Sequence, residues 1–213
     1  MAHAPNEPVV AGLLLAAGGG RRLGGHPKAL LSHRGRPLVE HAVRVLREGG
    51  CDTVHVVLGA AAEHVRQEAD LSGCVVVDNA DWQDGMGSSL RTGLESLTAT
   101  PAGAALVCLV DQPGIGAPAV ARVRAAYRSR DALVAASYNG ERGHPVLFGA
   151  DRWKAIAASA VGDRGARAYL KEHADAIELV ECGDIAEAYD IDTTEDLARL
   201  ERPAHPEQTA HLE

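Results

Sequence analysis

Continuous apolar runs alternate with amphipathic segments along most of the chain. The clearest run covers residues 9–16 and ends at a string of glycines, as expected for a strand buried on both faces. Further apolar or β-rich runs lie at residues 53–58, 74–77, 104–110, 132–136 and 177–181. Segments with helical spacing separate them, at residues 38–47, 62–69, 88–97 and 117–127. This order predicts an α/β fold: one Rossmann-like, mostly parallel sheet with right-handed crossovers and helices on both faces.

Residues 137–148 break the alternation. Their Asn139-Gly140 pair stands between two β-like stretches, and Asn-Gly favours the tight turn of a hairpin. We therefore expect a β-hairpin extension laid over the edge of the sheet. Two helical stretches are predicted after it, at residues 152–158 and 164–173, and a closing helix at residues 194–200.

Length and composition favour one domain with a packed core. The chain has 213 residues, of which 46% are hydrophobic. We place the domain at residues 8–201 and expect the polar ends, residues 1–7 and 202–213, to be flexible.

The net charge and the cysteine pattern indicate which partners the protein binds and which cellular compartment it occupies. The net charge of −8 disfavours nucleic acid, which requires a basic surface. No apolar run is long enough to cross a membrane, and the polar N-terminus does not resemble a signal peptide. The four cysteines show no CxxC spacing, which favours free thiols in a reducing compartment. We expect a cytoplasmic protein.

A glycine-rich loop follows the first predicted strand. Residues 16–28 hold five glycines, two arginines and a lysine. In an open α/β sheet, ligands bind beyond the carboxyl ends of the strands, where this loop lies. Glycines let backbone N–H groups approach phosphate oxygens, and Arg22 and Lys28 would neutralise their charge. The alternative is a flexible turn with solvated arginines, but so many glycines without a ligand would be costly in chain entropy.

Two common phosphate-binding patterns do not fit the loop. A GxGxxG pattern that starts at Gly18 meets Leu23 in place of its third glycine, which disfavours a dinucleotide site. A P-loop that starts at Gly20 meets His26 in place of its lysine, which disfavours a Walker-type ATPase.

The loop resembles the signature loop of MobA-like nucleotidyltransferases, a family within the larger group of sugar-1-phosphate and cytidylyl transferases. The matching residues are Leu15, Ala16, Ala17, Gly18, Gly20, Arg22, Gly24 and Lys28. Further blocks resemble the family's molybdopterin cytidylyltransferases and follow in the family's order, at residues 79–90, 111–113, 143–146, 162–167 and 190–193. The resemblance covers residues 13–200 and implies a nucleotide-diphospho-sugar transferase-like fold.

Two aspartates are candidate Mg²⁺ ligands. Asp111 directly follows the apolar run 104–110, so it lies at the ligand edge of the sheet. Mg²⁺ prefers few carboxylates together with phosphate oxygens and water. Asp192 is the second candidate, since alternation places it on one face with Asp190. Either aspartate would also suit a helix N-terminus, where Thr193 is another candidate cap.

The resemblance implies which residues contact the substrates. Catalytic roles fall to Arg22, Lys28 and Asp111. Nucleotide binding falls to Leu15, Ala16, Ala17, Gly18, Gly20, Arg22, Lys28, Asn79, Gly85, Ser88 and Ser89. Acceptor binding falls to His144, Asp163, Arg164 and Arg167. Asn79 offers donor and acceptor groups to a base edge, whereas the two serines would also suit plain capping of the helix after them. The alternative for the arginines is a solvated surface loop.

The implied reaction is Mg²⁺-dependent transfer of CMP from CTP to the terminal phosphate of molybdenum cofactor, a phosphorylated pterin, with release of pyrophosphate. The acceptor phosphate is already anionic, so the site needs positioning and charge neutralisation without a general base. In the family, Ala-Ala-Gly at positions 16–18 is typical of cytidylyl enzymes and Ala-Gly-Gly of guanylyl enzymes. A molybdoenzyme or its maturation chaperone is the implied protein partner.

Three other functions stay open. One keeps the chemistry but uses GTP or another NTP with a different phosphorylated acceptor. Another is a nicotine-blue-type oxidoreductase, an assignment that some bacterial relatives carry, although the missing dinucleotide pattern disfavours it. The third is a non-catalytic cofactor carrier, which would not need Asp111 together with Arg22 and Lys28.

Overall fold

A computed structural model describes residues 9–200, and its main sheet has seven strands in the order β5-β4-β1-β6-β8-β7-β9. The strands are β1 (Val10–Leu15), β4 (Thr53–Leu58), β5 (Val75–Asp78), β6 (Ala104–Leu109), β7 (Leu133–Tyr138), β8 (Glu141–Gly149) and β9 (Glu178–Glu181). Every pairing is parallel except the two that β8 makes with β6 and β7. A separate ribbon pairs β2 (Ser32–His33) with β3 (Arg36–Pro37). The mostly parallel α/β sheet is therefore confirmed, while the predicted flexible ends lie outside the described residues.

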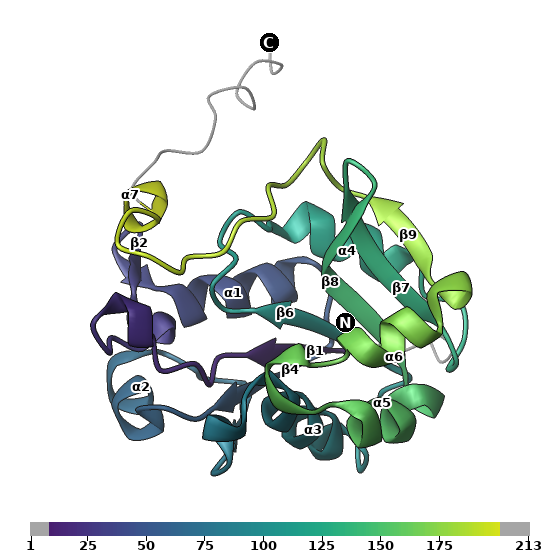
Figure 1. The fold of residues 1–213 in the computed structure, drawn as a ribbon, viewed down its shortest axis with the longest axis horizontal. Coiled ribbons are helices and arrows are strands. Elements are labelled where there is room, and N and C mark those ends of the chain that lie inside the picture. The colour runs from purple at the N-terminus through teal and green to yellow at the C-terminus, as the bar shows by residue number, and fades with distance from the viewer. Residues whose placement is uncertain (1–8, 201–213) are drawn as a thin grey trace.

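Helices cover both faces of the sheet (Figure 1). One face carries α1 (Leu38–Glu48), α2 (Ala62–Glu68) and α4 (Ala117–Ala125), and the other carries α3 (Met86–Leu97), α5 (Trp153–Ser159) and α6 (Arg167–Glu172). Strand β1 shows why, since Leu14 packs into the first layer while Leu13 and Leu15 pack into the second. None of the described helices has the length and apolar character needed to cross a membrane.

The Asn139-Gly140 turn joins β7 to β8, with positive φ angles of 55° and 84° as a tight hairpin requires. The expected position of the hairpin was wrong. Strand β8 does not lie over the sheet edge but enters the sheet between β6 and β7. Its second half explains the difference, because Leu147 packs into one hydrophobic layer while Val146 and Phe148 pack into the other. A strand that is apolar on both faces suits this position, because helices cover both faces of the sheet there.

Two predicted helices are shorter than expected. Gly165, at a φ of +51°, separates a 3₁₀ turn (Gly162–Arg164) from α6. The closing helix α7 spans only Leu197–Leu200. Before it, Asp196 accepts hydrogen bonds from the backbone N–H groups of Asp192 and Thr193, which holds this segment in a turn.

The register of the central strands sets the position of the site. Leu15 at the end of β1 pairs with Val57 of β4 on one side and with Leu109 of β6 on the other. The loops that follow β1 and β6 therefore begin side by side at one edge of the sheet. This is the edge at which α/β proteins bind ligands.

Candidate functional site

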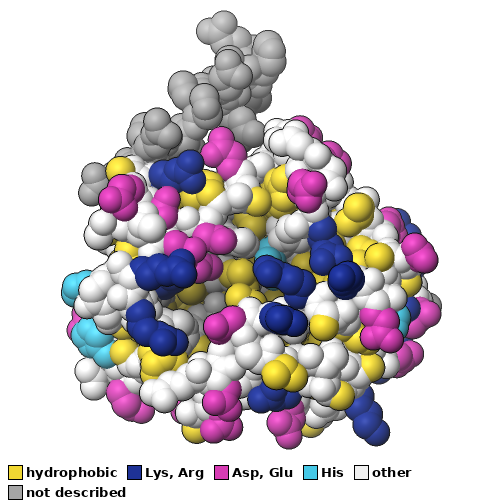
Figure 2. All heavy atoms as spheres, in the orientation of Figure 1, with side chains coloured by type: hydrophobic (Ala, Val, Ile, Leu, Met, Phe, Trp, Pro, Cys, Tyr) yellow, Lys and Arg dark blue, Asp and Glu magenta, His cyan; other side chains and the backbone are white. Residues whose placement is uncertain are grey.

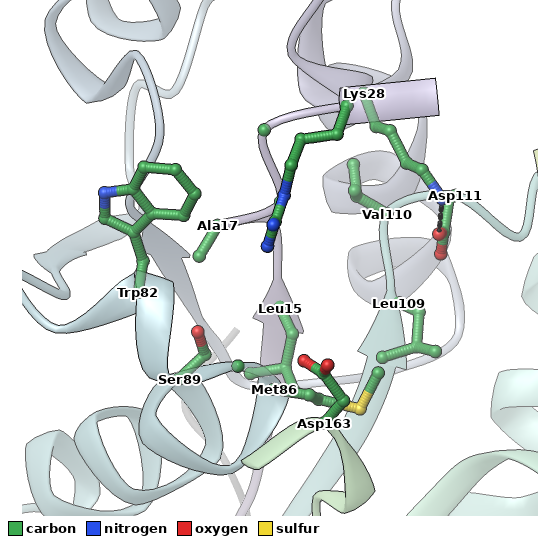
Figure 3. Close-up of a pocket in the computed structure, with 14 residues that line it drawn as sticks. Leu15, Ala17, Lys28, Trp82, Met86, Ser89, Leu109, Val110, Asp111 and Asp163 are labelled. Carbon is green, nitrogen blue, oxygen red and sulfur yellow. Dashed lines mark hydrogen bonds and ion pairs between the residues drawn. The ribbon is translucent and has the colours of Figure 1, made fainter. Parts of the chain in front are cut away.

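A cavity of about 210 Å³ opens at this edge, beyond the ends of β1 and β6 (Figure 3). Its walls come from the glycine-rich loop, Lys28, the end of β6, the start of α3 and the turn before α6. The lining residues are Leu15, Ala17, Gly18, Gly19, Arg21, Lys28, Trp82, Gly85, Met86, Ser89, Leu109, Val110, Asp111 and Asp163. On this face of the molecule, lysine and arginine side chains flank a central hollow on both sides, with a few acidic side chains at its rim (Figure 2). The surroundings therefore suit an anionic ligand although the whole chain is acidic.

Lys28 joins the two aspartates predicted to bind metal. Its Nζ lies 2.6 Å from Oδ2 of Asp111 and 2.5 Å from Oδ1 of Asp192. These partners stand 83 and 164 residues away in the sequence. The backbone N–H of Ile191 donates to the carbonyl oxygen of Asp111 at 2.9 Å, which draws the segment with Asp192 towards the end of β6. One ammonium group thus bridges carboxylates from distant parts of the chain.

Burial and charge compete in this cluster. Burial alone would lower the pKa of Lys28, but the charge and hydrogen bond of Asp111, followed by those of Asp192, outweigh it and raise that pKa. Burial raises the pKa of Asp111, and the nearby charge of Lys28 offsets only part of that effect. Lys28 therefore stays charged, and the partly buried Asp111 carboxylate depends on a cation in contact with it.

The two carboxylates fit a divalent metal ion. Their oxygens already converge on one cationic group, and the cavity beside them leaves room for phosphate oxygens. Mg²⁺ sites that bind nucleotides typically use one or two carboxylates and complete their shell with phosphates and water. Within residues 9–200, no group of three or more His, Cys, Asp or Glu side chains could hold a metal. A metal ion held by Asp111 and Asp192 would therefore need the oxygens of a substrate or water to complete its shell.

Neither aspartate serves as a helix cap. The residue that caps α4 is Gly116, five positions after Asp111. The carboxylate of Asp192 points to Lys28, and Asp196 is the residue that accepts the nearby backbone N–H groups. Residues 190–192 form no strand, yet Ile191 between the two aspartates is fully buried.

The glycine-rich loop curls tightly after β1. Gly20 has a φ of +59°, and a Cβ there would lie 1.8 Å from the carbonyl oxygen of His26, so only glycine fits. The 3₁₀ turn that follows (Arg21–Leu23) sends its two arginines in different directions. Both arginines are exposed, but Arg21 lines the cavity whereas Arg22 places Nη1 3.9 Å from Oδ2 of Asp192. Sequence reasoning selected Arg22 and missed Arg21, because two adjacent arginines give no signal of which faces inward.

Ala16 and Gly20, also predicted to bind the nucleotide, do not line the cavity and act through backbone hydrogen bonds. The backbone N–H of Ala16 donates to the carbonyl oxygen of Val57 at 2.9 Å, which continues the sheet. Gly20 accepts from the N–H groups of Leu23 and Gly25 at 2.8 and 3.1 Å, which closes the turn. Of the predicted loop residues, the cavity itself receives Leu15, Ala17, Gly18 and Lys28.

The segment from Asn79 to Ser89 is held by its own polar groups. Nδ2 of the buried Asn79 donates to the hydroxyls of Ser88 and Ser89 at 2.8 and 3.0 Å, and its Oδ1 accepts from the N–H of Asp81. Ser88 donates to the carbonyl oxygens of Asp81 and Gly85. Asn79 and Ser88 therefore form an internal frame, and the frame presents Ser89 and Gly85 to the cavity. Helix α3 has no side-chain cap, so the serines do not cap it.

Trp82 is a wall residue to which sequence reasoning gave no role. A Cβ on Gly59 would lie 2.5 Å from Cβ of Trp82, and one on Gly19 would lie 3.4 Å from its ring. The tryptophan therefore packs closely over two glycines that follow β4 and β1. Trp82 and Ala17 stand on one side of the cavity, and Lys28 and Asp111 stand on the opposite side (Figure 3).

The predicted acceptor residues do not all gather in one place. His144 on β8 is half-buried, and its carbonyl oxygen accepts a hydrogen bond from the hydroxyl of Tyr138 at 2.6 Å. Burial lowers the pKa of His144 to about 4; the charge of Asp190 opposes this, while Arg142 and Arg167 add to it. His144 is therefore neutral at physiological pH and has charged groups of both signs near it.

The other two predicted acceptor residues, Asp163 and Arg164, lie in the 3₁₀ turn before α6. Asp163 lines the cavity that also holds the glycine-rich loop, although the sequence assigned it to the acceptor. Arg164 beside it is exposed. A neighbouring polar contact joins Nε2 of Gln112 to Oδ1 of Asp190 at 2.8 Å.

Comparison with known proteins places these features in a family context. The family described as MobA-like NTP transferase domain matches residues 12–177. Nicotine blue oxidoreductase of Paenarthrobacter nicotinovorans is 41% identical over 200 residues, which cover 91% of this chain and 97% of that protein. Molybdenum cofactor guanylyltransferase of Burkholderia orbicola (strain MC0-3) is 30% identical over 207 residues, which cover 93% of this chain and 98% of that protein.

A solved structure agrees with the fold. The crystal structure of Rv0371C in complex with manganese, from Mycobacterium tuberculosis H37Rv, matches with a TM-score of 0.75 and 26% sequence identity. The match covers 90% of this chain and 97% of that one.

Proposed function

The chain belongs to the MobA-like NTP transferase family of nucleotidyltransferases, and we propose that it transfers CMP from CTP to the terminal phosphate of molybdenum cofactor. The observation that carries this proposal is the contact of Lys28 with Asp111 and Asp192 beside the glycine-rich loop. A cation, two converging carboxylates and a glycine-rich turn are the parts that a metal-bound triphosphate requires. A carrier of the finished cofactor would need none of them.

In the proposed mechanism, Asp111 and Asp192 would hold Mg²⁺. Bound there, the metal would neutralise charge on the α-phosphate and on the leaving pyrophosphate. Lys28 and Arg21 bind the triphosphate, with Arg22 at the rim, and the N–H groups of the glycine-rich loop approach its oxygens. An oxygen of the acceptor phosphate forms a bond to the α-phosphorus while the bond to pyrophosphate breaks. No proton has to move, so the site needs no general base.

The proposed preference for CTP rests on Ala17. Its side chain lines the cavity next to Trp82, and a Cβ on Gly59 would lie 2.9 Å from its methyl group. This wall is closely packed, so a methyl group at position 17 narrows the slot for a base as large as guanine. A site matched to one base leaves polar groups unpaired with another, which discriminates strongly.

Replacing Ala17 with glycine tests this preference. The Ala17→Gly variant should relax the CTP-over-GTP ratio of kcat/KM about fivefold without reversing it, because Ser89 and Gly85 also line the cavity. Ala60→Gly, in the same neighbourhood but outside the cavity lining, is the matched control. If the unmodified protein prefers GTP, as the name of the Burkholderia relative suggests for that protein, the cytidylyl proposal fails while nucleotidyl transfer stands.

The acceptor is proposed to bind beyond Asp111, where Arg167 and neutral His144 lie near each other. Arginine suits a phosphate because its guanidinium group donates two parallel hydrogen bonds. Arg164 on the neighbouring turn is a further phosphate ligand in this proposal. A cytoplasmic location and a molybdoenzyme client or its chaperone belong to the same proposal.

A pyrophosphate-release screen tests the whole proposal. The four common NTPs are each incubated with Mg²⁺ and either molybdenum cofactor or a panel of sugar phosphates. We expect release with CTP and molybdenum cofactor, with much less from other pairs. Release only with a sugar phosphate would correct the acceptor, and no release from any pair would contradict nucleotidyl transfer.

A second candidate function is dye reduction, because the relative that is 41% identical is named nicotine blue oxidoreductase. The cavity carries phosphate-binding groups that an NADPH diphosphate could also use. Oxidation of NADPH in the presence of nicotine blue, without pyrophosphate release from any NTP, would favour this function. An Asp111→Asn variant with undiminished NADPH oxidation would separate it from metal-dependent transfer.

A further inference from the structure

Asp163 is the one predicted acceptor residue that lines the nucleotide cavity. It comes from the turn before α6, more than 50 positions along the chain from the other lining residues. In Figure 3 its carboxylate points into the cavity beside Met86, in the region between Ser89 on one side and Asp111 on the other. The structure gives this carboxylate no hydrogen bond or ion pair with any described residue.

Packing fixes the backbone of the turn that carries Asp163. A Cβ on Gly85 would lie 2.4 Å from Oδ1 of Asp163, and one on Gly87 would lie 2.8 Å from the backbone of Val161. Nη1 of Arg91 on α3 donates to the carbonyl oxygen of Ala160 at 2.5 Å. The turn at residues 160–165 is therefore fixed against the start of α3. The exposed carboxylate of Asp163 thus stands on a fixed turn at the cavity, where a ligand that donates hydrogen bonds can reach it.

The charge of Asp163 limits what that ligand group can be. A carboxylate repels phosphate, so it does not face the triphosphate that Lys28 and Arg21 would bind. The base is proposed to lie at the opposite side, by Ala17 and Trp82. Between base and triphosphate a nucleotide has its ribose, whose two adjacent hydroxyls can both donate to one carboxylate.

We propose that Asp163 binds the 2′- and 3′-hydroxyls of the ribose and so selects ribonucleotides over deoxyribonucleotides. This inference rests on the proposed function, since it requires an NTP in this cavity. It also changes the assignment of Asp163 from the acceptor to the nucleotide. Because the same turn includes Arg164 and leads into α6 at Arg167, a ribose contact would fix the start of the proposed acceptor site.

Calorimetric titration of CTP, 2′-deoxy-CTP and 3′-deoxy-CTP in Mg²⁺ tests the proposal. The unmodified protein should bind CTP about tenfold tighter than either deoxy form, the size expected for hydrogen bonds to a charged group. In Asp163→Ala this ratio should fall to about one, through weaker binding of CTP. Asp163→Asn keeps the size of the side chain and should show an intermediate ratio.

Asp84→Ala is the matched control, because it removes an exposed negative charge from the same neighbourhood without changing the cavity lining. The Asp84→Ala variant should leave the ratio of the affinities for CTP and deoxy-CTP unchanged. Equal factors of change for CTP and both deoxy forms in Asp163→Ala and Asp163→Asn would overturn the proposal. A change confined to the KM of the acceptor would also overturn it. So would a change confined to the ratio of the affinities for CTP and UTP, because that would mean that Asp163 contacts the base.

Failure of the proposed function has a different signature. If the unmodified protein binds none of the CTP forms, both the nucleotide site and the ribose contact are wrong. If it binds CTP and 2′-deoxy-CTP equally, the nucleotide site stands and only the ribose contact is wrong.

Discussion

Charged side chains of the candidate site pair with one another in one half of the sheet, whereas the two predicted acceptor arginines in the other half have no such partner among the described residues. On the nucleotide side, around β1 and β6, Lys28, Asp111 and Asp192 satisfy one another at 2.5 and 2.6 Å. On the proposed acceptor side, around β8 and α6, Arg164 and Arg167 are exposed and form no ion pair with any described residue. The charged groups of the first region are therefore held by one another, whereas the two arginines of the second are free to meet a ligand. Substitutions should therefore cost more on the nucleotide side.

The largest expected effect is that of Asp111→Asn. This change keeps the size of the side chain but removes the charge that would hold Mg²⁺, so turnover should fall by roughly 10² or more. Pyrophosphate release at saturating substrates measures it. Asp184→Asn is the control, since that aspartate pairs with Arg122 at the surface. Full activity of Asp111→Asn at ordinary Mg²⁺ would remove Asp111 from the mechanism.

Lys28→Ala should have the next largest effect. Loss of the ammonium group should weaken CTP and GTP by similar factors, about tenfold each, because the triphosphate is common to both. The circular dichroism spectrum should be unchanged, and the exposed Lys154→Ala is the control. A loss confined to one base would mean that Lys28 reads the base, contrary to its assignment.

Arg167→Ala tests the acceptor side and should have a smaller effect. An exposed guanidinium group contributes less than a buried one, so we expect the KM for the acceptor to rise about fivefold with the KM for CTP unchanged. Arg128→Ala, on the surface away from the cavity, is the control. An equal rise in both KM values would show that the two halves are not separate, and the contrast drawn above would not hold.

The smallest effect concerns pH. Burial lowers the pKa of His144 from 6.5 to about 4. The unfolded chain therefore binds the proton first as pH falls, so stability declines below about pH 6.5 and the loss is complete near pH 4. Between pH 7 and 5 the melting temperature should therefore fall about 2 °C more in the unmodified protein than in His144→Gln. Identical pH dependence in the two proteins would show that His144 is not held neutral.

Much of the fold could be predicted from local pattern alone. The apolar runs identified strands β1, β4 and β6, because strands buried on both faces must be continuously apolar. The place of β8 could not be predicted in this way. Its apolar second half is compatible with an edge or an interior position, and only pairing with residues far along the chain decides between them.

The candidate site, too, could be predicted only in part from the sequence. Lys28 and Asp111 could be predicted because each follows a strand that ends at the ligand edge. The contact of Asp192 with Lys28 spans 164 residues and depends on how the segment before α7 returns to β6. Likewise, the inward direction of Arg21 depends on a turn of three residues, and the closed frame around Asn79 depends on the start of α3. Side-chain direction is tertiary information, which residue identity does not carry.

Calorimetric titration of CTP with and without Mg²⁺ shows whether the proposed nucleotide side binds a metal–triphosphate. In Mg²⁺ we expect saturable binding that weakens at least about tenfold when EDTA removes the metal. The same dependence on Mg²⁺ should be absent in Asp111→Asn. Equal affinity for CTP in Mg²⁺ and in EDTA, or binding of NADPH but of no NTP, would contradict the account.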